Sequence, residues 1–266
     1  MAGIRLQVNV HIVTGAVTSV QNIMRSCHHS QIEVADIALE SLASAKAVLT
    51  PEEREIGVAL VDIGGGTTDI AIFANNSIKY TEVLALGGQN LSNDIAFGLR
   101  TPIASAEKIK IKYSCAMMEL VHNDEVILVP SVGGRQPRKI SRMALAQICE
   151  PRMDEILCLV DQSLERSGIK HMLGAGVVLT GGTSLIEGCQ ELGEQIFKTS
   201  TRIGAPRNVE GLKDMVNSPS YATAVGLLRY GMEKELSGQK KFTTHDDTQI
   251  FVGLIERMKK WFSEVF

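Results

Sequence analysis

The sequence has few of the residues that mark secreted, zinc-stabilised or nucleic-acid-binding chains. Its five cysteines are scattered and odd in number, which argues against both a disulfide framework and a zinc site. The net charge is only −3, and aromatic and basic residues do not interleave, so nucleic acid is not an expected partner. No apolar run approaches the roughly 18 residues of a membrane-spanning helix, and no signal-peptide pattern occurs at the N-terminus. We therefore expect a reducing compartment and, at most, peripheral membrane contact.

The chain has enough apolar residues for a sizeable core of one or two domains, since 44% of its 266 residues are apolar. Stretches of strand composition alternate with helical patterns, which predicts an α/β fold. The first stretch, Ile4 to Ile12, alternates apolar and polar residues and predicts a half-buried strand. A helix over 17–27, a short strand over 37–39 and an Ala-rich helix over 42–49 are expected next.

A glycine-rich stretch between two apolar runs is the most informative part of the sequence. Val58 to Val61 and Ile70 to Phe73 have strand composition, and the segment between them predicts a hairpin turn. Three consecutive glycines allow left-handed backbone and close approach to a ligand. Backbone N–H groups and two threonine hydroxyls there can hold phosphate oxygens. The residues concerned are Gly64, Gly65, Gly66, Thr67 and Thr68.

The acids that flank this turn suit a nucleotide site with a metal ion. Asp62 and Asp69 favour a site in which Mg²⁺ neutralises the phosphates, because Mg²⁺ keeps its waters and uses few carboxylates. No Gly-Lys-Ser/Thr follows, which excludes a P-loop, and the glycines precede a strand, which excludes the dinucleotide fingerprint. A glycine-rich hairpin with solvated acids is the alternative.

A second glycine loop follows a later strand. The strand over 176–179 ends in Thr180-Gly181-Gly182-Thr183, before a helix over 187–198. Taken alone this fits an ordinary tight turn, but two such loops fit a nucleotide held between phosphate and adenosine sides. Glu107 and Lys110 lie three apart on one predicted helix face, where a surface ion pair is the simpler interpretation. A long helix over 140–167 is expected to break or kink at Pro151.

The C-terminal segment predicts an amphipathic helix after a polar linker. Residues 237–247 are polar and predict a flexible linker. Beyond them, apolar residues fall on one helical face and charged residues on the other, which fits in-plane binding to an anionic membrane. A helix docked on the core or on a partner is the alternative. The residues expected at the membrane are Phe251, Leu254, Ile255, Met258, Lys259, Lys260, Trp261 and Phe262.

Several motifs occur in the order found in the actin, Hsp70 and sugar-kinase superfamily of ATPases. They are Asp62–Asp69, Ala106–Lys110, Thr180–Thr183 and Ser220–Gly226. With Pro130–Arg135, Arg202–Pro206 and the amphipathic tail, they make essentially the whole chain similar to the FtsA family of bacterial cell-division proteins. The resemblance implies an actin-like (ribonuclease H-like) ATPase fold with a partial first lobe and a complete second lobe.

The resemblance also implies a function. Proteins of this kind bind ATP, self-associate on the cytoplasmic side of the inner membrane, tether the tubulin-like protein FtsZ there and recruit other division proteins. By motif position, Asp62 would be the catalytic residue, positioning the hydrolytic water and holding Mg²⁺ through water. The glycine turn would hold the β- and γ-phosphates, Glu107 and Lys110 would contact the adenosine, and Gly181, Gly182 and Thr183 would close over it.

Partner contacts follow from the same resemblance. A subdomain over about 87–167 would bind the C-terminal peptide of FtsZ. That peptide is partly acidic, so Arg135, Arg138 and Arg152 are its candidate contacts. The resemblance divides the chain into a remnant of the first lobe (1–57), the second lobe (58–236), the linker (237–247) and the membrane-targeting helix (248–266).

The family pattern has an earlier part that this sequence does not match. A first phosphate loop and an extra subdomain would precede the region that matches Ile4. We therefore expect a shortened version with an exposed apolar edge at Ile4 to Ile12, weak or no ATP binding, and a weak ATPase activity at most. A sugar kinase, a chaperone-type ATPase and an actin-like pilus-assembly protein are the alternative functions.

Overall fold

The computed structural model describes residues 8, 10–122, 124–133, 135–210 and 216–236. The chain forms two compact units. The first comprises Met1–Val13 and Ala38–Glu233, and the second comprises Thr14–Ile37 and Lys234–Phe266. In the second unit, the predicted helix is present as α1, Val17–His29. The predictions for the linker and for the membrane-targeting helix fall outside the described residues.

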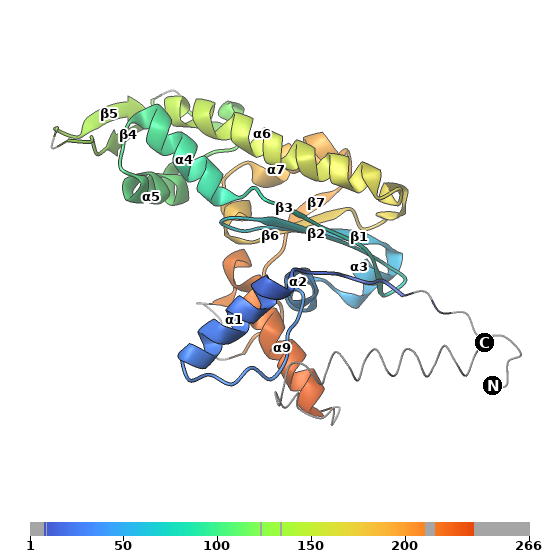
Figure 1. Cartoon of the computed structure of the whole chain (residues 1–266). Coiled ribbons are helices and arrows are strands. Elements are labelled where there is room, and N and C mark those ends of the chain that lie inside the picture. The colour runs from blue at the N-terminus through green and yellow to red at the C-terminus, as the bar shows by residue number, and fades with distance from the viewer. Residues whose placement is uncertain (1–7, 9, 123, 134, 211–215, 237–266) are drawn as a thin grey trace, which may run out of the picture. The chain divides into compact units, whose positions relative to one another are not determined.

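A five-stranded mixed sheet is the centre of the first unit (Figure 1). Its strand order is β3-β2-β1-β6-β7, with β1, β2 and β3 antiparallel and β1, β6 and β7 parallel. Every residue of β1 and β2 is buried, which explains why both read as continuous apolar runs rather than alternating ones. The bounds are β1 Val58–Ile63, β2 Thr68–Ala74, β3 Ser77–Leu84, β6 Val177–Thr180 and β7 Thr201–Ile203.

Helices cover both faces of this sheet (Figure 1). One face carries the larger core, in which Val61 and Ile72 pack with Ile95 of α4 and Ile156 of α6. The opposite face packs Leu60 and Phe73 with residues of α2 and α9. The bounds are α2 Glu40–Val48, α3 Pro51–Ile56, α4 Gly88–Leu99, α5 Ile103–Tyr113, α6 Arg142–Arg166, α7 Cys189–Phe197 and α9 Ala222–Leu236, with short 3₁₀ turns η1 Met118–Leu120, η2 Lys170–Met172, η3 Gly182–Leu185 and η4 Pro219–Tyr221.

A separate two-stranded hairpin lies beside α4, α5 and α6. Its strands are β4, Val126–Val129, and β5, Arg138–Ser141, paired antiparallel. β5 contains residues 140 and 141, which were expected to begin the long helix. The helix instead begins at Arg142. Ser141 caps it, because its side chain accepts a hydrogen bond from the Ala144 amide at 3.2 Å. Pro151 lies inside this continuous helix, so it does not break the helix, and the alternative of a kink stays a prediction.

The strand predicted over Ile4 to Ile12 is not seen in its described residues. Val8 and residues 10–13 belong to no strand, and Val8, Val10 and Ile12 are exposed. An alternating pattern places apolar side chains on one side, but a strand also needs a neighbour for its backbone hydrogen bonds. The strand predicted over 37–39 is also wrong, because these residues lead directly into α2.

Three arginines from different elements hold the C-terminal end of α2. Arg54 of α3 donates to the Ala45 carbonyl, Arg202 of β7 to that of Val48, and Arg229 of α9 to that of Lys46. Helix-terminal carbonyls lack intrahelical partners and carry partial negative charge, so cationic donors stabilise this end. Among the described residues, no helix combines the length and apolar content needed to cross a bilayer.

Candidate functional site

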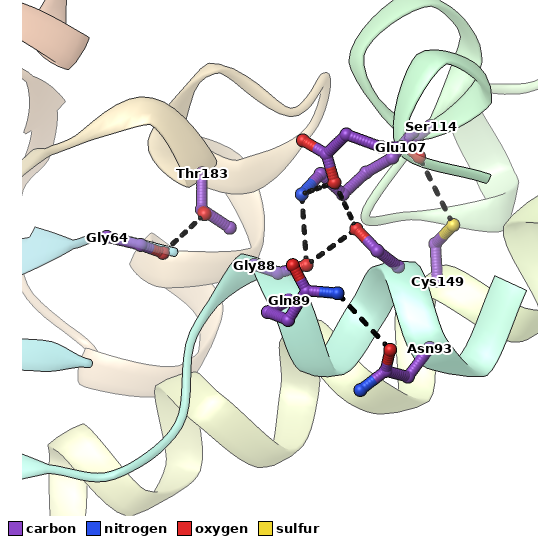
Figure 2. A network of polar contacts seen from close by, with 10 residues as sticks. Gly64, Gly88, Gln89, Asn93, Glu107, Ser114, Cys149 and Thr183 are labelled. Carbon is purple, nitrogen blue, oxygen red and sulfur yellow. Dashed lines mark hydrogen bonds and ion pairs between the residues drawn. The ribbon is translucent and has the colours of Figure 1, made fainter. Parts of the chain in front are cut away.

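The two glycine loops lie side by side because the strands that precede them are parallel neighbours. Asp62 at the end of β1 is in register with Thr180 at the end of β6. The chain therefore leaves both strands at the same edge of the sheet, where α/β proteins commonly bind ligands. The Thr183 hydroxyl of the second loop donates to the Gly64 carbonyl of the first at 2.9 Å (Figure 2).

Gly181 permits this close approach. Its φ is +85°, a left-handed conformation, and a Cβ there would lie 2.4 Å from Asp62 Oδ1 and 2.5 Å from the Ile63 carbonyl oxygen. Both the backbone conformation and the contact with the first loop therefore require glycine.

In the first glycine loop, unlike at Gly181, backbone conformation does not explain the glycines. None of Gly64, Gly65 and Gly66 has a left-handed backbone, contrary to one use expected of them. A Cβ on Gly65 or Gly66 would meet no described atom within 4 Å. The fold of the described chain does not itself require these two glycines, which leaves room beside them for a ligand.

Gly87 and Gly88, at the start of α4, pack against the first glycine loop. The Gly88 and Gln89 amides donate to the carbonyls of Gly64 (2.9 Å) and Gly65 (2.7 Å). A Cβ on Gly87 would lie 2.7 Å from the Gly65 carbonyl oxygen. The sequence showed this pair as a helix start, but not as a part of the site.

Glu107 and Lys110 form the predicted ion pair at 2.8 Å, and the pair is not a free surface pair (Figure 2). Lys110 Nζ also donates to the Gly88 carbonyl at 3.0 Å, and Ser92 donates to both that carbonyl and the Glu107 carboxylate. Burial alone raises the pKa of Glu107, but the hydrogen bonds from Lys110 and Ser92 outweigh it and hold the pKa below its ordinary value.

Asp62 points to the α2 and α9 side of the sheet. It accepts hydrogen bonds from Ser44 of α2 (2.7 Å) and Thr223 of α9 (3.4 Å). Burial raises the pKa of Asp62, and these two hydrogen bonds only partly offset that. Sequence reasoning did not identify Ser44 or Thr223, which lie 18 and 161 positions from Asp62.

Glu40, at the start of α2, is a third carboxylate in this region that sequence reasoning missed. Burial raises its pKa most, followed by repulsion from Asp69 and then Asp62. Burial likewise raises the pKa of Asp69, with a smaller contribution from Asp62. Glu40 precedes the helix predicted over 42–49, and an acid near a helix start is too common to indicate a site.

The buried charge of Asp62 gives a pH-dependent prediction. The pKa of Asp62 in the folded chain lies above its ordinary 3.8. The folded chain therefore keeps the Asp62 carboxyl protonated to a higher pH than the unfolded chain does. The contribution of Asp62 to the free energy of unfolding therefore falls as the pH rises from its ordinary pKa through its raised pKa in the folded chain. We expect Asp62→Asn to be more stable than the parent at neutral pH and similar in acid, measured by urea unfolding. A free energy of unfolding that increases in the parent relative to the variant as the pH rises would contradict this.

The two threonines of the first loop differ in availability. Thr68 is fully buried and its hydroxyl donates to the Leu86 carbonyl at 2.8 Å, so it supports the fold of the loop. Thr67 is exposed and donates to Asp69 at 3.1 Å. A phosphate role for either side chain stays a prediction, and Thr67 is the more accessible.

A cavity of about 450 Å³ opens between the two loops and α5. Six of the predicted residues line it, whereas Asp62, Gly66, Thr67, Thr68 and Gly181 do not. The six are Gly64, Gly65, Glu107, Lys110, Gly182 and Thr183, and the lining residues that sequence reasoning missed are Ile111, Lys112, Ser114, Arg142, Leu185, Ile186, Glu187 and Ser220.

The three arginines predicted to bind a partner lie outside this cavity. Arg152 binds both carboxylate oxygens of Asp94 on α4, at 2.5 and 3.1 Å. Arg138 donates to the Leu99 carbonyl at the end of the same helix. Arg135 is exposed in the loop before β5. Their role in binding a peptide stays a prediction.

The described residues include no group of three or more His, Cys, Asp and Glu side chains that could hold a metal ion. A Mg²⁺ site held by few carboxylates and water stays a prediction.

The sequence is similar to those of known cell-division proteins. Over 264 residues the chain is 49% identical to cell division protein FtsA of Pseudomonas aeruginosa, covering 98% of this chain and 63% of that protein. It is 40% identical to cell division protein FtsA of Escherichia coli K12, covering 100% of this chain and 65% of that protein. The chain thus spans less than two thirds of the length of either relative.

The fold prediction is confirmed by solved structures. MreB5 of Spiroplasma citri bound to AMPPNP superimposes with a TM-score of 0.65 at 20% identity, over 85% of this chain and 68% of that one. The fold is therefore actin-like. The sequence model described as "Cell division protein FtsA" matches residues 59–226, and the chain belongs to this family.

Proposed function

We propose that the cavity between the two glycine loops binds ATP. One observation carries this proposal: the space beside Gly65 and Gly66 is open, and neither backbone conformation nor packing requires glycine there. A phosphate group held by backbone N–H groups needs such close approach, which a side chain would prevent. Gly64 to Thr67 would then contact the β- and γ-phosphates.

Other residues that line the cavity suit a nucleoside. Glu107 and Lys110 are fixed by Ser92 and Gly88 and would meet the ribose, with Gly182 and Thr183 on the other side. Ile111 and Leu185 also line the cavity, and they are 76% and 55% exposed. Two apolar side chains left exposed in a cavity suit the faces of a planar base.

The comparisons support a nucleotide in general terms. Structures of MreB5 of Spiroplasma citri contain ADP or AMPPNP. In this chain Asp62 would contribute to Mg²⁺ through water and position the hydrolytic water, although its carboxylate is engaged by Ser44 and Thr223. Mg²⁺ would neutralise the phosphate charge. An ATPase activity of this chain would be weak at most.

Titration with labelled ATP and Mg²⁺ tests this site. We expect binding weaker than low-micromolar. Leu185→Ser should weaken it about fivefold by removing an apolar contact to the base. Leu228→Ser is the matched control, since Leu228 is 70% exposed on α9 and does not line the cavity. Equal effects of the two substitutions would contradict the proposed base position.

We further propose that the chain has the role expected of its family in cell division. In this role it polymerises at the cytoplasmic side of the inner membrane and tethers FtsZ there, with residues 248–266 as the membrane-binding helix. An acidic FtsZ peptide would meet Arg135 in the exposed loop first. It would have to compete with Asp94 for Arg152 and with the Leu99 carbonyl for Arg138.

Co-sedimentation with anionic vesicles tests the membrane contact. We expect the full chain to pellet with phosphatidylglycerol vesicles and a chain stopped at Leu236 to stay in the supernatant, because the amphipathic segment is then missing. A single helix binds weakly, so pelleting should increase steeply where the chain self-associates. Neutral phosphatidylcholine vesicles are the control. Equal pelleting of the two chains would exclude the tail as the tether.

A further inference from the structure

Arg142, the first residue of α6, has a guanidinium group in which every nitrogen is engaged. Its side chain is only 13% exposed. Nε donates to the Tyr113 carbonyl at 2.8 Å, Nη1 to the Glu125 carboxylate at 2.7 Å, and Nη2 to the Glu187 carboxylate. Arg142 lines the cavity, and three of its five N–H bonds are given to these acceptors.

The three acceptors belong to three different parts of the chain. Tyr113 ends α5 and precedes Ser114, a cavity-lining residue. Glu187, just after η3, lines the same cavity from a second segment of the chain. Glu125 immediately precedes β4, and the Arg142 amide also donates to its carbonyl at 2.8 Å. One guanidinium therefore joins two walls of the cavity to the β4–β5 hairpin.

Backbone contacts hold the two walls at the same place. The Ala116 amide donates to the Glu187 carbonyl at 2.7 Å, and Cys115 forms a parallel bridge with Glu187. These contacts do not use the Glu187 side chain, so removing its carboxylate cuts the link to Arg142 and leaves the main-chain connection in place.

The Arg142–Glu187 ion pair is expected to contribute little to the free energy of unfolding. The Glu187 side chain is 50% exposed, and ion pairs with a solvent-exposed partner contribute little to the free energy of unfolding. Both Arg142 and Glu187 line the cavity, and a positional role explains their pairing better.

We propose that Arg142 is a positioning residue that couples occupancy of the nucleotide cavity to the β4–β5 hairpin. This inference rests on the proposed nucleotide site. A ligand that touches both α5 and the loop after η3 restrains the two walls that share Arg142. The same guanidinium then restrains Glu125 and the start of β4. By linkage, a partner that prefers the restrained hairpin raises nucleotide affinity by the same factor as the nucleotide raises the partner's.

Hydrogen exchange on the full chain tests this coupling. The amides of 126–129 and 138–141 are followed with and without millimolar Mg²⁺–ATP, and binding is measured separately by titration. In the parent, we expect nucleotide to slow hairpin exchange about fivefold or more, the lower end of usual coupling. In Glu125→Ala, which changes a residue outside the cavity lining, nucleotide should still bind, but the hairpin response should disappear.

Each outcome bears on a different claim. Exchange without nucleotide reports any purely structural effect, so only the nucleotide-dependent difference counts. Glu165→Ala is the matched control, because Glu165 is an exposed carboxylate paired with Lys170 beyond the other end of α6, and it should keep the response. A response retained in Glu125→Ala, or a parent that binds nucleotide without any response, overturns the coupling and leaves the nucleotide site standing. A parent that binds no nucleotide overturns both.

Discussion

Gly181→Ala is expected to cost about 2–5 kcal/mol of the free energy of unfolding and to abolish ATP binding. The left-handed backbone at φ +85° disfavours any residue with a Cβ by about 1–2 kcal/mol. The new methyl group would also lie 2.4 Å from Asp62 Oδ1 and 2.5 Å from the Ile63 carbonyl oxygen, and such overpacking adds about 1–3 kcal/mol. The two glycine loops would be pushed apart. Urea unfolding and ATP titration measure the two effects.

Gly65→Ala is the matched control, and it separates ligand approach from folding. A Cβ at Gly65 would meet no described atom within 4 Å, and its backbone is not left-handed. We expect the free energy of unfolding to change by less than about 0.5 kcal/mol. ATP binding should weaken about tenfold or more, because the methyl group occupies the approach of the phosphates. A stable Gly65→Ala chain with unchanged ATP binding would place the phosphates elsewhere.

Gly226→Ala is expected to destabilise the chain by about 3 kcal/mol or more. A Cβ on this residue of α9 would lie 1.8 Å from the Ala43 carbonyl oxygen and 2.3 Å from its carbonyl carbon. Both are main-chain atoms of α2, so no side chain can rotate away and the helices must separate. Ser44 and Thr223, the donors to Asp62, lie beside this contact. Thermal or urea unfolding measures the loss.

Gly231→Ala, on the same helix, should have the opposite sign. A Cβ there would meet no atom of the described residues within 4 Å. Replacing an exposed mid-helix glycine by alanine usually stabilises a helix by about 0.5–1 kcal/mol. If Gly226→Ala and Gly231→Ala both changed stability by the same small amount, close packing of α9 on α2 would be refuted.

Local features of the fold were predictable from the sequence. The β1–β2 hairpin follows from two apolar runs and a glycine turn. α3 begins at Pro51 after a capping box, in which Thr50 and Glu53 bond each other's backbone amides, and this local pattern is typical of helix starts. β5 and β7 were missed because four and three residues carry too little pattern to recognise. The strand over Ile4 to Ile12 was predicted from alternation alone, without knowledge of a pairing partner.

The site was predictable where its residues share a motif. Glu107 and Lys110 are three apart on one helix, so their pairing follows from helix geometry. Their contact with Gly88, 22 positions before Lys110, depends on how α4 and α5 pack and has no local signal. The partners of Asp62 and the three acceptors of Arg142 were missed for the same reason, because each joins segments that only tertiary folding brings together.

The parallel pairing of β1 with β6 has a consequence for how the chain folds. Ala59 pairs with Val177, so this pairing closes a loop of more than a hundred residues, whereas the β1–β2–β3 meander closes by short turns. Contacts of long sequence separation form late, because the chain entropy of closing such a loop must be overcome first. The meander, with the first glycine loop, can form early. The second glycine loop joins it only once α4 to α6 are compact, so the cavity is assembled in the last steps of folding.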